Sequence, residues 1–451
     1  MSLPLFHYQD VAADWLAPKD RAGEHDEMGI GKTATVIGGI NRTLGSRGMI
    51  IAPAMLRQNW LREFQRFSTY PIGIVKAQNI HDFIAWQRGR FDTLICSYEH
   101  ATSWRDMMFE RNEFIDFIHM DEAHYLKNEK SQRSRAILGG YDEDDKYQEG
   151  ITLFAERSWH ITGTPMANDP LDIYTFLKHC DAVSGLSSAE FVKYFFERRA
   201  TTYGFRHMVK EHMLPVLQQL LDNNRISRTH GEVGLELPPI WMKELILEGG
   251  TVEIDKLIAM YPHVEQMIID AIQNDNFKAL MDLDYIATIR RLVGKAKAQP
   301  YADMLRLELN GGASIKRVAF FVHTEPLLAV RAQLQKYGYK PVVVYGDTPE
   351  KDRQEAVRLF MEDETVGPFL GNMKVAGVGL TLTASSEIDV VESDWTPANN
   401  AQAIKRVHRY GQTRDVHARF ITLASSIDEA VNRVVAGKTA AIAQVEGRQA
   451  S

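Results

Sequence analysis

Two short segments of the chain carry the residue types that handle phosphates. Residues 26–33 read DEMGIGKT. Glycines let backbone N–H groups wrap around phosphate oxygens, a lysine neutralises their charge, and a threonine hydroxyl can ligate Mg²⁺. The residues placed to do this are Gly29, Gly31, Lys32 and Thr33. The segment predicts a phosphate-binding loop, although alone it also fits an ordinary glycine turn before a helix.

This loop departs from the strict pattern at one position, because Asp26 stands where that pattern has glycine. Residues 22–25 before it are hardly apolar. They are therefore a poor candidate for the strand that should lead into such a loop.

The second segment, residues 121–124, reads DEAH and directly follows an apolar run. A carboxylate at the C-terminal end of a strand can hold Mg²⁺, and a neighbouring carboxylate can orient and deprotonate an attacking water. We therefore assign Asp121 to the metal and Glu122 to the water. The alternative is a capped helix start with exposed acids.

A basic segment near the C-terminus offers a third element of the same chemistry. Residues 402–412 read QAIKRVHRYGQ, and Arg406 and Arg409 are spaced to share one face of a helix. Delivered from a second lobe, they would act as arginine fingers on the γ-phosphoryl group. Without the other motifs, a solvated basic helix would be the better interpretation.

The elements that must position these residues follow an α/β pattern at both ends of the chain. Apolar runs that read as buried strands alternate with helical patterns, such as residues 56–67 and 131–138, which is typical of a parallel sheet covered on both faces. The expected strands are residues 48–53, 91–98, 114–120, 159–163, 317–323, 341–346, 388–392 and 417–422.

The middle of the chain is different, because its apolar residues recur at helical spacing. The acidic, turn-rich residues 139–150 read as a solvated surface loop. We expect an α/β protein with lobe 1 at 1–180, a mostly helical insertion at 181–300, lobe 2 at 301–437 and a tail at 438–451.

The composition is typical of a globular protein and bears on its partners and its cellular compartment. The 451 residues are 45% hydrophobic and 25% charged, with a net charge of −7 that argues against a wholly basic protein but not against a local basic groove. Cys96 and Cys180 cannot form a disulfide framework. No apolar run is long enough to span a membrane and the first residues lack a signal-peptide pattern, so we expect a cytoplasmic protein without a membrane partner.

In this order, the segments resemble the SNF2 family of superfamily 2 motor ATPases. DEMGIGKT differs from the family's DEMGLGKT at one position, and residues 227–230 (SRTH) stand where the family has Arg-Arg-x-Lys. Further matches are Tyr8-Gln9 and residues 52–67, 97–99, 125–131, 160–168, 346–360, 376–383, 394–397 and 406–413. Within these matches, residues 376–383 (AGVGLTLT), together with residues 290–297, are similar to the annealing-helicase branch of the family.

The resemblance implies two RecA-like lobes of a P-loop NTPase, the superfamily 2 helicase core, with ATP and Mg²⁺ as its cofactors. It implies that Gln9 contacts adenine. The phosphates and Mg²⁺ would be bound by the loop residues above, with Asp121 on the metal and Glu122 on the water. Gly379, Arg406 and Arg409 would approach from lobe 2. Coupling of hydrolysis to lobe movement would fall to His124, Thr162 and Thr164.

The function expected from this resemblance is an ATP-dependent translocase of double-stranded DNA that does not unwind its strands. Its partner would be duplex DNA in plain, forked or branched form, and the motor would be monomeric, with protein partners not indicated. A strand-separating DNA or RNA helicase and a catalytically silent DNA-binding scaffold stay as alternatives. Since no appended reader domain is apparent, we expect a bacterial or phage source.

Overall fold

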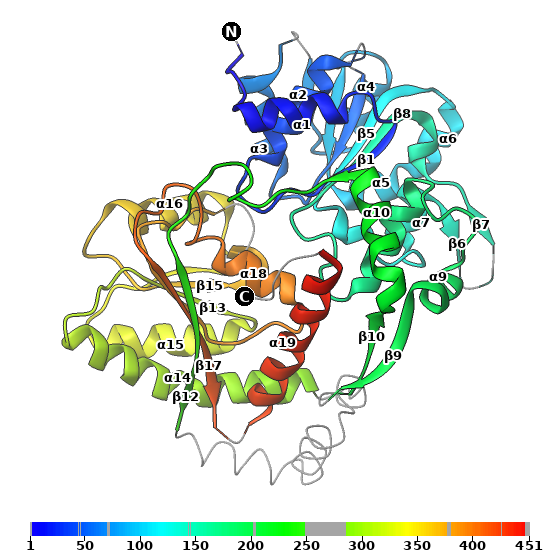
Figure 1. The fold of residues 1–451 in the computed structure, drawn as a ribbon. Coiled ribbons are helices and arrows are strands. Elements are labelled where there is room, and N and C mark those ends of the chain that lie inside the picture. Colours follow the sequence, from blue (N-terminus) through cyan, green and yellow to red (C-terminus); the bar gives the residue numbers. More distant parts are fainter. Residues whose placement is uncertain are drawn as a thin grey trace. The chain divides into compact units, whose positions relative to one another are not determined.

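The computed structural model describes residues 2–43, 45, 47–69, 73–142, 144, 146–201, 204–248, 286–376, 380–424 and 426–446. The chain forms two compact units, here called lobe 1 and lobe 2 (Figure 1). Lobe 1 consists mainly of Met1–Glu197 and Val209–Leu235, and lobe 2 mainly of Glu236–Gln444. Each lobe contains a sheet of parallel strands, which confirms the predicted fold class.

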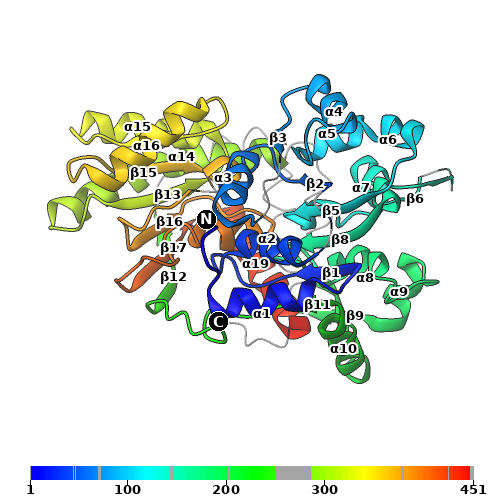
Figure 2. The same ribbon diagram turned by 90° about the horizontal axis from the view of Figure 1, so that it is seen from above.

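The sheet of lobe 1 has seven strands in the order β11-β1-β8-β5-β2-β4-β3, and Figure 2 shows the run from β11 to β2 in this order. All of its strand pairs are parallel. The strands are β1 (Arg21–Glu24), β2 (Gly48–Ile51), β3 (Ile74–Lys76), β4 (Thr93–Cys96), β5 (Ile115–Asp121), β8 (Ala155–Ile161) and β11 (Arg225–Ile226).

Helices cover both faces of this sheet. Successive side chains of its strands point to opposite faces and pack into two different apolar clusters. Ile50 of β2 packs with residues of α1, α2 and α3, whereas Met49 and Ile51 pack with residues of α4 to α7. The helices of this lobe are α1 (His7–Leu16), α2 (Lys32–Arg42), α3 (Arg57–Phe67), α4 (Ile80–Gln87), α5 (Tyr98–Ser103), α6 (Arg105–Arg111), α7 (Gln132–Leu138), α8 (Tyr174–His179), α9 (Ser188–Phe195) and α10 (Leu214–Asn224).

Short elements complete this part of the chain. The predicted acidic surface loop contains the antiparallel hairpin β6–β7, and a second pair, β10–β9, follows α9. The hairpin strands are β6 (Gly140–Tyr141), β7 (Tyr147–Gln148), β9 (Phe196–Thr201) and β10 (Gly204–Val209). Single 3₁₀ turns lie at Ala123–Leu126, Ile151–Phe154, Pro170–Ile173 and Glu211–Met213.

The sheet of lobe 2 has six strands in the order β12-β17-β16-β13-β15-β14. In β13, Val318 and Phe320 face one apolar cluster while Ala319 and Phe321 face another, so this sheet is also covered on both sides. Its strands are β12 (Ile240–Leu247), β13 (Arg317–Phe321), β14 (Val342–Val344), β15 (Phe369–Asn372), β16 (Glu387–Val390) and β17 (Val416–Leu423). Its helices are α14 (Ile286–Asn310), α15 (Thr324–Lys336), α16 (Glu350–Glu362), α17 (Met373–Ala376), α18 (Pro397–Ile404) and α19 (Ile427–Glu446).

A buried lysine fastens α14 to the sheet of lobe 2. Lys297 is fully buried. Its Nζ donates hydrogen bonds to the carbonyl oxygens of Val391 and of Ile421, the latter at 3.1 Å, and lies 2.7 Å from Asp428 Oδ2. One ammonium group therefore joins α14 to residues at or just after the ends of β16 and β17 and at the start of α19.

The range predicted as an insertion, 181–300, contributes to both lobes. β11 pairs with β1 in the sheet of lobe 1, and β12 pairs with β17 along its whole length in the sheet of lobe 2. Neither strand was predicted. Residues 249–285, a part of the predicted helical insertion, lie outside the described residues.

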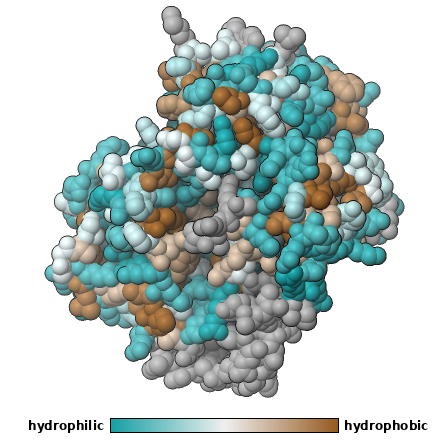
Figure 3. Space-filling model, viewed as in Figure 1, coloured by the Kyte–Doolittle hydropathy of each residue, from teal (hydrophilic) through white to brown (hydrophobic). Residues whose placement is uncertain are grey.

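Among the described helices, none combines the length and apolar character needed to cross a membrane. In Figure 3, hydrophobic residues occur as separate groups among hydrophilic ones on the face that is drawn.

Candidate active site

The segment between β1 and α2, residues 25–31, is the one predicted to bind phosphates and is called the phosphate loop below. The preceding strand exists despite its poor sequence pattern, since β1 pairs with β8 on one side and β11 on the other. Gly29 and Gly31 have φ angles of 93° and 95°, a region that glycine enters without steric cost. An added Cβ at Gly31 would meet Gln9 Nε2 at 2.4 Å. The left-handed backbone therefore favours glycine at both positions, and a side chain at Gly31 would also displace the amide group of Gln9.

Lys32 begins α2, and its ammonium group lies against the phosphate loop. Nζ donates to the carbonyl oxygens of Asp26 at 2.9 Å and of Glu27 at 3.1 Å. Thr33 follows in the same turn. The first N–H groups of a helix have no partner within the helix. The start of α2 therefore combines a lysine, a hydroxyl and backbone N–H donors, all of which can bind an anion.

Gln9 is joined to the same loop from α1. Its Nε2 donates to the carbonyl oxygen of Ile30 at 3.2 Å, and its Oε1 accepts from the N–H of Phe6 at 3.0 Å. The hydroxyl of Tyr8 donates to the same Ile30 oxygen at 2.9 Å. The structure thus brings the predicted adenine-contacting residue to the phosphate loop, with both ends of its amide engaged within the protein.

Asp121 ends β5 and is buried. Trp60 Nε1 donates to Oδ2 at 2.7 Å, and the N–H of Glu122 donates to Oδ1 at 2.9 Å. Burial raises the pKa of Asp121 to about 7, the charge of Glu122 adds to the rise, and the charge of Lys32 opposes it. A carboxylate whose charge is disfavoured by burial gains from a nearby cation.

The side chains of Asp121 and Thr33 fit Mg²⁺ chemically, because both offer oxygen ligands. Among the described residues, no group of three or more His, Cys, Asp or Glu side chains could form a metal cage alone. Such a cage is not needed, since Mg²⁺ bound with nucleotide phosphates usually takes only one or two protein ligands and keeps several waters.

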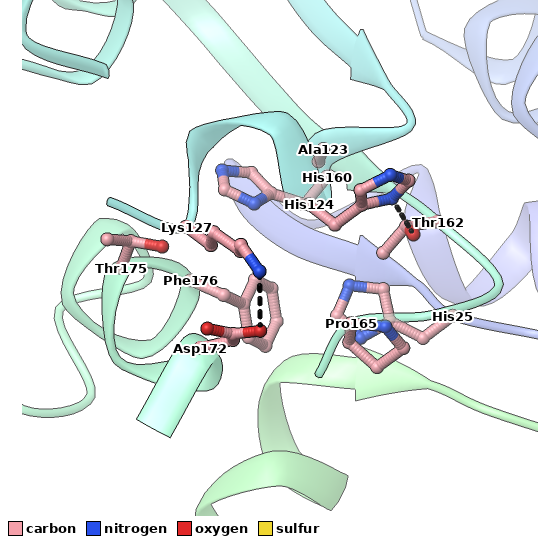
Figure 4. Close-up of a pocket in the computed structure, with 10 residues that line it drawn as sticks. All are labelled: His25, Ala123, His124, Lys127, His160, Thr162, Pro165, Asp172, Thr175 and Phe176. Carbon is pink, nitrogen blue, oxygen red and sulfur yellow. Dashed lines mark hydrogen bonds and ion pairs between the residues drawn. The ribbon is translucent and has the colours of Figure 1, made fainter. Parts of the chain in front are cut away.

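Glu122 and His124 connect the DEAH segment to residues 162–165, which read TGTP. Glu122 has a left-handed φ of 51°, and its Oε2 lies 3.3 Å from His124 Nδ1. The same ring nitrogen lies 3.1 Å from Thr162 Oγ1, the contact drawn in Figure 4, and 3.5 Å from Thr164 Oγ1. The residues expected to couple hydrolysis to movement therefore form one hydrogen-bonded cluster within lobe 1.

A small cavity lies beside this cluster, lined among others by His25, His160 and Thr162 (Figure 4). Its volume is about 10 Å³. That is room for about one water molecule, so this cavity is not a nucleotide pocket.

In lobe 2, Arg406 and Arg409 do not lie on a helix, so the prediction that they share one helical face is wrong. Their role as arginine fingers stays a prediction. α18 ends at Ile404, and the chain continues in tight turns, with Arg406 N–H bonded to Ala403 O and Gln412 N–H to Arg409 O. Arg409 donates to the carbonyl oxygen of Leu380 at 3.1 Å, and burial lowers its pKa. Gly379 lies outside the described residues.

One contact at the phosphate loop was not predicted from the sequence. The guanidinium group of Arg228 meets the carboxylate of Asp26, with Nη2 at 2.5 Å from Oδ2 and Nε at 3.1 Å from Oδ1. His230 Nδ1 lies 2.7 Å from Glu27 Oε2. The sequence feature that could have indicated this contact is residues 227–230 (SRTH), which stand at the family's Arg-Arg-x-Lys position.

Comparison with known proteins identifies the two domains. The SNF2-related domain matches residues 8–249, and the helicase conserved C-terminal domain matches residues 301–411. The chain is 25% identical over 89% of its length to the "DNA annealing helicase and endonuclease ZRANB3" of Bos taurus and 25% identical over 92% to the "Chromodomain-helicase-DNA-binding protein 1-like" of Mus musculus.

These relatives are longer proteins. The chain spans 37% of the first and 46% of the second. A solved structure, the "Sulfolobus solfataricus SWI2/SNF2 ATPase core in complex with dsDNA", aligns with a TM-score of 0.45 and 18% identity, covering 99% of this chain and 94% of that one. The relatives include both an annealing helicase and a chromodomain helicase at equal identity, so the predicted nearness to the annealing branch stays a prediction.

Proposed function

Because the chain belongs to the SNF2-related family, whose domain matches residues 8–249, we propose that it is an ATP-dependent translocase of double-stranded DNA that does not separate the strands. The observation that carries this proposal is the convergence of Lys32, Asp121 and Glu122 in lobe 1. This proposal is supported by the pKa of Asp121, which the charge of Glu122 raises and the charge of Lys32 lowers, so the three groups are near enough to interact.

In this site the loop and α2 bind the triphosphate. Gly29 and Gly31 let the backbone approach it, and Lys32 moves from the carbonyl oxygens of Asp26 and Glu27 to the phosphate oxygens. Gln9 contacts the adenine by exchanging one of its internal hydrogen bonds for the base.

Mg²⁺, held by Asp121 and Thr33, would neutralise phosphate charge when bound. Glu122 accepts the proton of the attacking water. Its carboxylate is partly exposed, with 22% of its side chain accessible, and is anchored on one side by His124. The exposed part of this carboxylate is where an attacking water molecule could be oriented.

Arg406 and Arg409 supply positive charge to the transferring phosphoryl group when lobe 2 closes, and Gly379 approaches the nucleotide from the same lobe. Burial lowers the pKa of Arg409, so its guanidinium carries a charge that an anionic partner would stabilise. Each cycle of closing and opening would advance the grip on DNA.

Duplex DNA is proposed as the track, whether plain, forked or branched. Support comes from the names of the relatives, which include a DNA annealing helicase and a DNA-binding chromodomain helicase. A translocase must contact phosphates rather than bases, because base-specific contacts would stop it at particular sequences.

Steady-state ATP hydrolysis tests the first part of the proposal. Turnover is measured with no nucleic acid, single-stranded DNA, duplex DNA, forked DNA and RNA. We expect duplex or forked DNA to stimulate turnover most. Stimulation by RNA alone, or none by any polymer, would contradict the proposal.

Two displacement assays test the second part. A translocase strips the third strand from a triplex but leaves a duplex intact, whereas a strand-separating helicase releases a strand from the duplex. If the duplex opens while the triplex survives, the helicase alternative is correct. If neither nucleotide turnover nor displacement occurs, the silent scaffold is the better description.

Three further expectations stay predictions from the sequence. They are a monomeric motor, a cytoplasmic location and a bacterial or phage source.

A further inference from the structure

The phosphate loop contains a buried acid at a position where negative charge is unfavourable for a nucleotide. The Asp26 side chain has no exposed surface. It occupies the position that strict phosphate loops give to glycine. Glu24, at the end of β1, is a second buried carboxyl group near it. Burial raises the pKa of Glu24 well above its ordinary value, and the charge of Asp26 adds to this rise. Since a raised pKa favours the neutral form of Glu24, the buried negative charge near the phosphates is that of Asp26.

Arg228 meets this acid with three separate donors. Its backbone N–H donates to Asp26 Oδ1 at 2.8 Å, Nε donates to the same oxygen at 3.1 Å, and Nη2 donates to Oδ2 at 2.5 Å. Nη1 donates to the carbonyl oxygen of Tyr8 at 2.7 Å. Paired guanidinium–carboxylate contacts of this kind are strong and fix orientation. One side chain thus ties the loop to the residue next to Gln9.

The backbone around Arg228 holds it in place beside the loop. β11 pairs with β1, and past its end the N–H of Glu27 donates to Arg228 O at 2.9 Å. The hydroxyl of Ser227 donates to His25 O at 3.2 Å. His230 then reaches Glu27. Residues 225–230 therefore follow the loop along its first half.

Lys32 contacts the backbone of Asp26 and Glu27, the same two residues whose side chains pair with Arg228 and His230. Its Nζ donates to the two carbonyl oxygens. Without Arg228, Asp26 would be a buried charge without its counter-ion, which is costly. The ammonium group of Lys32, already at the Asp26 carbonyl, is a cation that could compensate it.

We propose that Arg228 is a positioning residue for ATP, which neutralises Asp26 and so keeps Lys32 available for the phosphates. This inference rests on the proposed function, because it assumes that the loop binds a nucleotide. It explains how a loop with an aspartate in place of glycine accepts a polyanion. Arg228 itself acts through Asp26 and Lys32 rather than by contact with the nucleotide.

The test measures nucleotide affinity and turnover separately in the full chain. Binding of a fluorescent ADP analogue is titrated without DNA, and KM and kcat for ATP are measured with saturating duplex DNA. For Arg228→Gln, we expect KM and the ADP dissociation constant to rise about tenfold, while kcat stays within about twofold.

The double variant Asp26→Asn/Arg228→Gln separates neutralisation from packing. If Arg228 acts by neutralising the acid, removing the acid as well should bring KM back to within about threefold of the wild type. A purely structural role would make the double variant at least as poor as Arg228→Gln, and this result would overturn the proposal. So would an unchanged KM in Arg228→Gln.

Arg42→Gln is the matched control, because Arg42 pairs with Asp10 and Asp14 in the same lobe and contacts no residue of the loop. Its KM should stay within about twofold of the wild type. If Arg228→Gln does not fold, Arg228→Lys replaces it. A retained charge should hold KM within about threefold, and a tenfold loss would overturn neutralisation.

The failure of this inference differs from failure of the proposed function. A wild-type protein without ATP turnover would contradict the function. The ADP titrations of the four proteins would still decide whether Arg228 and Asp26 set the affinity of the loop.

Discussion

Two adjacent carboxylates in this protein have unlike surroundings. Asp121 is buried and accepts hydrogen bonds from Trp60 and from the N–H of Glu122, whereas Glu122 keeps 22% of its side chain accessible. Neighbouring acids held in different environments can take different tasks, and here one suits a cation and the other a water molecule. Two predictions follow from this difference.

Glu122→Gln should reduce ATP turnover by about 10²–10⁴-fold, the usual contribution of a positioned general base. Binding of ATP should change little, because the side chain keeps its size and its place beside His124. Turnover and nucleotide titration measure the two effects. Glu129→Gln, which removes a carboxylate that pairs with Lys178, is the control and should retain turnover. Equal losses in both variants would contradict the assignment.

Asp121 should make stability depend on pH. Its pKa is raised from 3.8 to about 7 by burial, so the folded state binds more protons than the unfolded state between these values. The unfolding free energy therefore falls as the pH rises from about 4 to 7, by an amount on the order of 1 kcal/mol or more. Asp121→Asn should flatten this decline. Urea unfolding at several pH values measures it, and identical slopes for the two proteins would refute the argument.

The contact between Asp26 and Arg228 shows what sequence reading misses at this scale. The motif residues Lys32, Asp121 and Glu122 were found because their neighbours along the chain form recognisable patterns. An ion pair between residues 202 positions apart leaves no periodic or local mark. Its only trace was a weakly matching SRTH segment, and one sequence cannot say which acid such an arginine meets.

Elements with continuous apolar runs were predicted, and those without them were missed. β2 reads as a strand because its residues after Gly48 are all apolar, and β5 because its apolar residues recur closely up to Met120. The helices α3 and α7 were found from their helical patterns. β1 was missed because its sequence is RAGE. It is nevertheless a strand, since β8 and β11 pair with it on both sides and supply the backbone hydrogen bonds that its composition does not suggest.

The turn from β1 into α2 should not tolerate a side chain at Gly31. Gly31→Ala would force a left-handed φ on alanine and a clash with Gln9, and we expect a loss of about 1–2 kcal/mol in stability together with weaker nucleotide binding. Thermal unfolding and ADP titration measure these effects. Gly73→Ala is the control, because its Cβ would lie 3.4 Å from Asp92 Oδ2, an ordinary van der Waals contact. Similar losses in both variants would contradict this account.

At the scale of the whole molecule, the chain repeats one design in two lobes. Each has a parallel sheet with an apolar cluster on both faces. This was predictable because alternation of strands and helices is visible in both end segments. The contribution of residues 181–300 was not, since β11 and β12 are joined to their sheets by pairing with distant strands rather than by any local pattern.

The proposed function predicts that arginines of lobe 2 control ATP turnover at the proposed site in lobe 1. Arg409→Ala and Arg406→Ala should each lower DNA-stimulated turnover by about 10³-fold, the lower end of the range for arginine fingers. Affinity for ADP should stay within about threefold, because lobe 1 holds the phosphates. Arg414→Ala, an exposed arginine in the same segment, is the control. Lost ADP affinity, or an equal loss in the control, would speak against this role.

The lysine at the centre of α14 affects how this polypeptide can be divided. The two domain matches end at residue 249 and resume at residue 301, and a fragment cut at those limits would separate the second sheet from β12 and from most of α14. It would expose the groove that α14 fills and leave the carbonyl oxygens of Val391 and Ile421 without their ammonium partner. Excising the C-terminal half for independent study therefore requires starting upstream of Ile240.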